Sequence, residues 1–182
     1  TVGPLCDRLA KEYDPDAMAC AGEALKDSLR LCADAPAAAP EMPAPALAIP
    51  EDMSAMVFGA LMGSIEQSCQ RRVDVLRTAE EEQYEEEDME AVEEAMEQEE
   101  EVMTDLIDAN GCLVRLHRAN YMALLEGHNG GASKKLLVNM LDESNPASLR
   151  CNALCVFIDM VEHCGDEVAP AVADAFLPAM VA

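Results

Sequence analysis

The stretch that decides the fold is residues 132–165, ASKKLLVNMLDESNPASLRCNALCVFIDMVEHCG. Ala132 to Leu141 carries apolar residues at helical spacing, and Asn145-Pro146 then opens a second apolar helix that runs to His163. Gly165 follows as a C-terminal stop signal. The stretch therefore predicts two helices joined by a short turn, which is the repeating unit of many all-α folds.

The same pattern recurs along the rest of the chain. Asp14-Pro15-Asp16 is a helix start with a capping acid, and residues 17–33 after it are amphipathic. Apolar helical periodicity resumes after Pro50 and again from Val102 to His117, and no strand signal exceeds a few residues. Paired helices that return about every 40 residues are typical of HEAT or armadillo solenoids. We predict an all-α fold, a HEAT-repeat α-solenoid of antiparallel helix pairs that is a fragment of a larger superhelix.

The chain divides into five predicted segments. They are a HEAT-type helix pair at 1–34, an Ala/Pro-rich linker at 35–50, a helix pair with an acidic insertion at 80–101 within 51–126, a HEAT repeat at 127–165, and the first helix of the next repeat at 166–182. Five prolines between residues 35 and 50 argue against a helix there. The chain begins without an initiator Met and ends within an apolar pattern, so we expect a segment of a longer protein.

The composition limits the classes of partner. The 182 residues include 36 acidic and 12 basic side chains, which give a formal charge of −24. Such a charge repels phosphate backbones, so direct binding of nucleic acid or of an anionic membrane is not expected. No window of 18 apolar residues predicts membrane insertion. A protein partner with a basic surface fits the charge best.

The acidic insertion concentrates this charge. Residues 80–101 contain fourteen acidic side chains in twenty-two positions and no Lys or Arg. The few apolar residues, such as Met89 and Val92, permit a helix with one thin apolar stripe, but like charges one turn apart oppose it, so solvated disorder is the alternative. Functionally, the insertion is either a solubilising segment that touches nothing or a counter-surface for Lys/Arg-rich partners.

No constellation of residues indicates catalysis or a metal centre. The eight cysteines are dispersed in apolar helical stretches, Cys20 and Cys32 among them, and we interpret them as small core residues of a reduced protein. A zinc site at Cys151, Cys155, His163 and Cys164 is disfavoured, because the last two lie about 12 Å further along the helix. No CxxC, HExxH, GxSxG or phosphate-binding loop occurs. The sequence predicts no enzyme, no cofactor and no bound metal.

Asp142 and Arg150 occupy positions typical of a HEAT repeat. The acid lies in the turn between two helices, and the arginine opens the second helix. We expect Asp142 to cap that helix and Arg150 to pair with acids of neighbouring turns.

Three features together resemble a known family. The acidic block contains Glu82-Gln83-Tyr84-Glu85-Glu86, residues 155–164 read CVFIDMVEHC, and residues 176–180 read FLPAM. This order resembles the C-terminal half of importin-β-type nuclear transport receptors (karyopherins), most of all the importin-5 or importin-β3 subfamily, in which an acidic insertion with a tyrosine interrupts one HEAT repeat. The resemblance covers most of residues 50–182.

The resemblance implies a nuclear import receptor that shuttles between cytoplasm and nucleus. Its partners would be protein cargo with basic signals, Ran GTPase in its GTP form, and nucleoporins, with cargo and Ran on a concave face made by the second helix of each repeat. The candidate contacts are Glu81, Glu85, Glu86, Glu87, Asp88, Asp159 and Glu162. The alternative is a HEAT-repeat scaffold subunit of a non-transport complex that binds basic protein partners through the acidic segment.

Overall fold

Every regular element of the structure, a computed structural model, is a helix. The structure describes residues 2–12, 14–38, 49–82, 86–166 and 169–180, and these ranges contain no strand. The predicted all-α class is therefore confirmed. In chain order the elements are α1 (Val2–Leu9), α2 (Pro15–Ala38), α3 (Glu51–Glu81), α4 (Glu86–His117), η2 (Arg118–Asn120), α5 (Tyr121–Gly127), η3 (His128–Gly131), α6 (Ala132–Met140), α7 (Ala147–His163) and α8 (Ala169–Met180).

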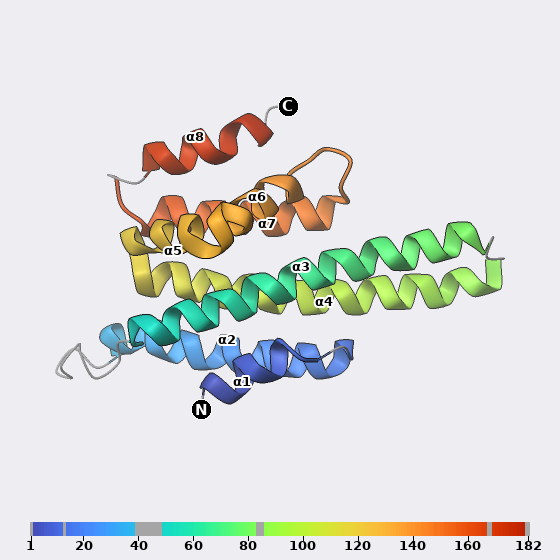
Figure 1. Cartoon of the computed structure of the whole chain (residues 1–182), viewed down its shortest axis with the longest axis horizontal. Helices are drawn as coiled ribbons and strands as arrows, with labels where there is room; N and C mark the ends of the chain where they lie inside the picture. Colours follow the sequence, from blue (N-terminus) through green and yellow to red (C-terminus); the bar gives the residue numbers. More distant parts are fainter. Residues whose placement is uncertain (1, 13, 39–48, 83–85, 167–168, 181–182) are drawn as a thin grey trace.

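The helices alternate between two rows. Helix α4 packs against α2 on one side and α7 on the other, which makes one row, and α3 packs beside α4 in the second row (Figure 1). Helices α2 and α4 run in the same direction, because Lys26 pairs with Asp105 and, further along both helices, Asp34 pairs with Arg115. In the second row, α1 contacts α3 and α6 contacts α8.

An apolar core fills the space between the rows. Its fully buried members come from elements far apart in the sequence and include Leu9, Met18, Leu25, Leu29, Leu61, Ile65, Met103, Leu106, Val156 and Phe176. Phe58 of α3 meets Tyr121 of α5 edge-on, with ring centroids 5.6 Å apart, and meets His128 at 5.4 Å. With so few aromatic residues, this trio fixes α5 and η3 against α3.

The helix boundaries agree in part with the sequence signals. Asp14 Oδ1 accepts a hydrogen bond from the Ala17 amide at 3.0 Å, so the predicted cap of α2 is confirmed. Gly165, which follows the C-cap residue Cys164 of α7, has φ +87°, as expected of a glycine that ends a helix. Helix α2, however, continues through Pro36 to Ala38, past the predicted linker boundary at residue 35. A proline in the last turn removes one amide donor, and the alanines around it favour helix. Residues 39–48 lie outside the described residues.

The described residues of the acidic insertion are helical except Glu82, which forms the turn after α3. Residues 80–81 end α3 and residues 86–101 begin α4, so the insertion contributes to both arms of a helical hairpin that projects beyond the two rows (Figure 1). Val92 is buried, whereas Met89 is 39% exposed, so the apolar stripe is thinner than predicted. The sequence did not reveal a change of helix here, because residues 80–101 contain no Gly, Pro or Asn.

The turn before α7 works differently from the prediction. Asp142 accepts hydrogen bonds from the amide and hydroxyl of Ser144 within the turn, which lowers the pKa of its carboxyl, while the residue that precedes α7 is Pro146. Asn145 caps the previous helix by donating to two carbonyls at the end of α6. The Arg150 Nε atom is buried without a hydrogen-bond partner, so the predicted pairing is not seen at that atom.

The cysteines divide between core and surface. All eight are free thiols, and Cys6, Cys112 and Cys164 are buried as expected of small apolar residues. Cys20, Cys151 and Cys155 are exposed, so their assignment to the core was wrong. They lie in apolar stretches of sequence but on the faces of α2 and α7 that point away from the core, because neighbours in sequence are about 100° apart around a helix.

Candidate functional site

Two of the acidic residues predicted from the hairpin, Glu81 and Asp88, are fully described and lie near its tip. Glu81 is exposed at the end of α3, with its Oε1 atom 4.0 Å from Arg77 Nε, and Asp88 is exposed near the start of α4. Glu86 and Glu87 belong to the first turn of α4, but their side chains lie outside the described part, as does all of Glu85. Negative side chains favour the start of a helix, where they interact with its dipole.

The two predicted residues on α7 lie elsewhere. Asp159 is half-buried and faces α4, and Glu162 is exposed. Asp159 lies beside Gly111, which is 23 residues along α4 from Asp88, or roughly 35 Å at the helical rise. The structure therefore places the described candidates in two regions, and the role of all seven as one binding surface stays a prediction.

A groove between α2 and α4 gathers a different set of acids. Its first part, about 600 Å³ in volume, is lined by Ala19, Cys20, Glu23, Glu97, Glu100, Glu101, Thr104 and Asp105. Five of these eight side chains are carboxylates and none is basic. Residues spaced by three and four share one face of a helix, so both α2 and α4 turn their acids into the same space. We call this part the acidic half of the α2–α4 groove.

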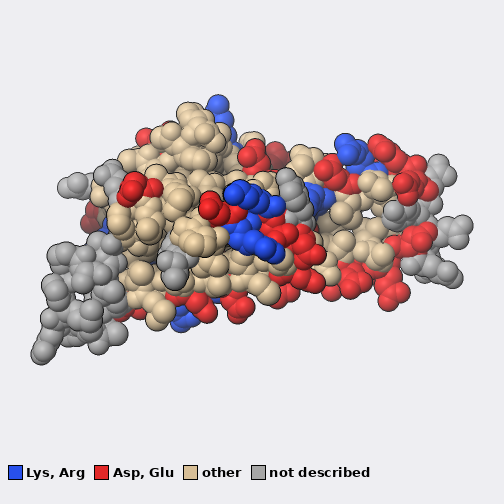
Figure 2. Space-filling view, turned by 60° about the horizontal axis from the view of Figure 1, so that its bottom comes forward, with Lys and Arg blue, Asp and Glu red and all other residues tan. Residues whose placement is uncertain are grey.

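The groove continues toward the C-terminal ends of both helices, where its charge changes. This second part, of about 350 Å³, is lined by Lys26, Arg30, Asp34, Asp108, Gly111, Cys112, Arg115, Asp159 and His163. The Lys26–Asp105 ion pair joins the two parts, since Asp105 lines the first and Lys26 the second. We call the second part the mixed half. On the face that Figure 2 shows, acidic side chains crowd the hairpin end of the molecule and a group of Lys and Arg side chains lies nearer the middle.

Gly111 brings α7 into this groove. A Cβ atom at this position would lie 2.3 Å from Asp159 Oδ2, so only glycine leaves room for the carboxylate as it stands. Burial raises the pKa of the Asp159 carboxyl above its usual range, although His163 and Arg115 act in the opposite direction. Asp159 is thus a carboxylate that α4 partly removes from water.

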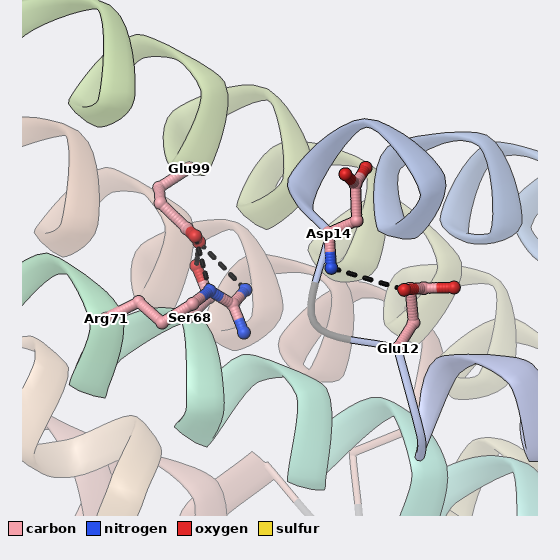
Figure 3. A network of polar contacts seen from close by, with 5 residues as sticks. All are labelled: Glu12, Asp14, Ser68, Arg71 and Glu99. Atoms are coloured by element: carbon pink, nitrogen blue, oxygen red, sulfur yellow. Dashed lines mark hydrogen bonds and ion pairs between the residues drawn. The ribbon is translucent and has the colours of Figure 1, made fainter. Parts of the chain in front are cut away.

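A buried polar network at the base of the hairpin orients the acidic half. Glu99 is 3% exposed and accepts a hydrogen bond from Ser68 Oγ at 2.6 Å and one from Arg71 Nη2 at 3.0 Å (Figure 3). Arg71 Nε also donates to Glu99, which makes the guanidinium–carboxylate contact bidentate. Because Glu99 points into the α3–α4 interface, Glu97, Glu100 and Glu101 face away from it, toward the groove.

One histidine contacts a hydroxyl group outside the groove. His128 Nδ1 lies 2.7 Å from Ser133 Oγ, and the serine is only 3% exposed. The ring also packs on Phe58, and residues 129–131 all have positive φ. The contact therefore fastens an irregular left-handed turn to α6 and α3.

Several residues that line the groove are not among the site residues predicted from the sequence. The basic members on α2, Lys26 and Arg30, follow one another at i,i+4 with Asp34 next in the series, which is a recognisable charged stripe. Glu97, Glu100 and Glu101 belong to the acidic insertion, and the sequence predicts no separate role for them. No sequence pattern indicated that the stripe on α2 would lie beside α4, because the two helices are some seventy residues apart in the chain.

The sequence of this chain matches no known family model and no curated protein. Across the described ranges, three or more His, Cys, Asp or Glu residues nowhere gather in a way that could bind a metal ion. Nor do the described helices include one with the length and apolar character needed to cross a bilayer.

Proposed function

We propose that the chain is a segment of an importin-β-type nuclear transport receptor and that its α2–α4 groove binds a Lys/Arg-rich segment of a protein partner. The observation that carries the proposal is the acidic half of the groove. Five carboxylates converge there from two helices of one row, and no basic side chain lines the space. Such a surface attracts basic segments over long distances and raises their rate of association.

The arrangement of helices supports a HEAT-type solenoid. Alternate helices fall into two rows, and α2 and α4 are parallel neighbours within one row. Parallel neighbours two elements apart are what stacked antiparallel hairpins produce. In that scheme α2, α4 and α7 are the second helices of successive repeats, the position that the sequence resemblance gives to the concave, partner-binding face.

The projecting hairpin enlarges the negative field of the groove. Residues 80–101 carry fourteen acidic side chains, and Glu97, Glu100 and Glu101 belong both to this run and to the groove. A basic partner attracted by the tip, where Glu81 and Asp88 are exposed, is therefore led along α4 toward the acidic half. The tip is a second contact for cargo or for Ran in its GTP form.

The test compares two variants of equal charge. In the groove variant, Glu97, Glu100 and Glu101 become Gln; in the control, the exposed Glu143→Gln, Asp166→Asn and Asp174→Asn remove the same charge away from the groove. Binding of a fluorescent Lys/Arg-rich peptide is measured by anisotropy between about 50 and 200 mM salt. We expect the groove variant to lose at least about tenfold in affinity, with a shallower salt dependence, and the control to lose less than about threefold.

Equal losses in the two variants would remove the groove from the proposal, because net charge alone would then explain binding. A second measurement, capture of the chain by Ran locked with GTP or with GDP, separates the transport role from the scaffold role. Preference for the GTP form supports a transport receptor. Binding of the basic peptide with indifference to the Ran nucleotide would assign the chain to a scaffold of a non-transport complex.

A further inference from the structure

The mixed half of the groove brings together several basic side chains of a protein that has few of them. The chain has only 12 Lys and Arg residues, and Lys26, Arg30 and Arg115 line this one space together with His163. They come from three helices, with α2 and α4 forming opposite walls and α7 adding the histidine. The groove thus changes from purely acidic to mixed in charge along its length.

Two of these cations are not tightly paired. Arg30 Nε and Arg115 Nη1 each lie 3.6 Å from a carboxylate oxygen of Asp34. Charge-assisted hydrogen bonds between such groups are usually about 2.7–2.9 Å long, so one carboxylate lies loosely between two guanidinium groups. Lys26 differs, because it makes a close ion pair with Asp105.

The remaining contacts of Arg115 are also weak. Its Nη2 atom donates to the thiol sulfur of Cys112 at 3.1 Å, and sulfur is a poor acceptor. Its side chain is 35% exposed and that of Arg30 is 67% exposed, so both guanidinium groups can be reached from the groove. A guanidinium group has five donors in a planar fork that matches a carboxylate or a phosphate.

The acidic residues of the mixed half leave donors of the Arg30 and Arg115 guanidinium groups available. Asp159 is directed against the backbone of α4 at Gly111, and its carboxylate is half-buried there. Asp108 is exposed at the rim of the groove. Asp34 is therefore the carboxylate that lies between the two arginines, and it engages neither closely.

From this juxtaposition we infer that the partner segment has two poles: a Lys/Arg-rich stretch that lies in the acidic half and an oxyanion-bearing side chain that lies between Arg30 and Arg115. The inference rests on the proposed function, since it specifies the partner of the same groove. The oxyanion is the carboxylate of Glu or Asp, or the phosphate of a phosphorylated serine. The second pole fixes the direction and register of the segment, which a uniformly acidic groove would leave undefined.

The spacing of the two poles follows from helix geometry. Seven residues of α2 separate Glu23 from Arg30, about 10 Å, and fourteen residues of α4 separate Glu101 from Arg115, about 21 Å. An extended chain advances about 3.3 Å per residue. The oxyanion is therefore expected three to six residues from the nearest Lys or Arg of the partner.

The experiment uses the whole chain and a series of synthetic peptides. Each peptide has a block of six Lys/Arg residues and one Glu placed one, four or nine residues beyond the block, in both chain directions. Matched peptides carry Gln or phosphoserine at the same position. Affinities are measured by anisotropy at fixed salt for the wild-type chain, for the Arg30→Gln/Arg115→Gln variant, and for a control in which Lys134 and Lys135 on α6 become Gln.

With the wild-type chain, Glu four residues from the block is expected to bind at least fivefold more tightly than Gln, in one of the two directions. Glu at one or nine residues should gain less than twofold. Phosphoserine distinguishes the source of the oxyanion: a larger gain than Glu favours a phosphorylated partner, and a smaller gain an acidic one. The gain should vanish in the Arg30→Gln/Arg115→Gln variant and persist in the Lys134→Gln/Lys135→Gln control.

Two results would overturn the inference, and they are distinguishable. If the basic block binds and neither Glu nor phosphoserine adds affinity at any position, the second pole is wrong while the proposed function stands. If the basic block itself does not bind, the proposed function fails and the inference fails with it. Circular dichroism of each variant confirms that lost binding is not lost folding.

Discussion

The long helices α3 and α4 have two ends in different surroundings. Near the rows, their apolar residues, such as Leu61, Met103 and Leu106, are fully buried. Beyond the Arg71–Glu99 contact, Val92 is the only buried residue among the described positions 73–81 and 88–98, and Val73 and Leu76 are about half exposed. Both helices continue from the buried region into the exposed region, so burial in a core does not determine where they end.

The difference shows that separate forces maintain the two ends. In the body, burial of apolar surface stabilises the helices at about 25 cal/mol per Å². In the distal hairpin, little apolar surface is buried, and the helices depend on the high helix propensity of residues such as Ala, Glu and Met. Repulsion between the acidic side chains opposes this propensity. Glu99 and Arg71 lie at the border, where a buried ion pair links the arms.

The largest effect on stability should come from comparing the same substitution, leucine to alanine, in two separate variants, one in the body and one in the distal hairpin. Leu106→Ala in the body leaves a cavity and is expected to lower the free energy of unfolding by about 2–5 kcal/mol. Leu76→Ala, the matched change at a residue 44% exposed, should cost less than about 0.5 kcal/mol. Urea denaturation followed by circular dichroism measures both. Similar losses would mean that the distal hairpin has a core of its own.

Stability should also depend strongly on the Arg71–Glu99 contact at the border between the body and the distal hairpin. Glu99→Gln leaves Arg71, whose side chain is 23% exposed, without its counter-charge and is expected to cost about 1–3 kcal/mol. Glu97→Gln, two residues away and exposed, serves as the control and should be close to neutral. Amide hydrogen exchange should show faster opening in residues 73–98 of the first variant. Unchanged exchange there would show that the pair does not join the arms.

The titration of Asp159 in the body of the protein should make the stability depend on pH. Burial raises the pKa of Asp159, so its protonated form is favoured in the folded state. As pH rises from about 3.9, where the unfolded chain ionises, to the higher folded-state value, this residue progressively lowers stability. We expect Asp159→Asn to remove that decline and to be the more stable protein at pH 7. The difference should be a fraction of the roughly 1.4 kcal/mol that one full pKa unit represents.

Thermal unfolding at pH 3, 5 and 7 checks this sign. Glu162→Gln, an exposed acid on the same helix, is the control and should follow the wild type. A wild-type protein that gains stability relative to Asp159→Asn between pH 4 and 7 would contradict the assignment.

The smallest effect concerns salt. Raising NaCl from 0.05 to 0.5 M shortens the range of repulsion from about 14 to about 4 Å, by the usual inverse square-root dependence. We expect exchange protection to increase by a few tenths of a kcal/mol in residues 88–98 and to change little in the body. Equal changes in both regions would show that the repulsion acts on the whole protein rather than on the hairpin.

Local signals in the sequence predicted the parts of the fold that local physics controls. The cap at Asp14, the stop at Gly165 and the buried stripe of Met18, Leu25 and Leu29 follow from spacing and side-chain chemistry. The change of helix inside the acidic run could not be predicted, because no turn-forming residue marks it. The groove could not be predicted from the sequence for another reason: its walls come together only when α2 and α4 pack against each other.

Because Gly111 has only a hydrogen atom in place of a Cβ, its identity determines where the Asp159 carboxylate lies in the groove. Replacing it with alanine would set a methyl group only 2.3 Å from Asp159 Oδ2, and the flexible end of the aspartate would be the part to yield. Its carboxylate would swing out of its partly dry niche into water, beside Arg115 and His163. One methyl group would thus redistribute negative potential along the groove while the formal charge of the molecule stayed the same.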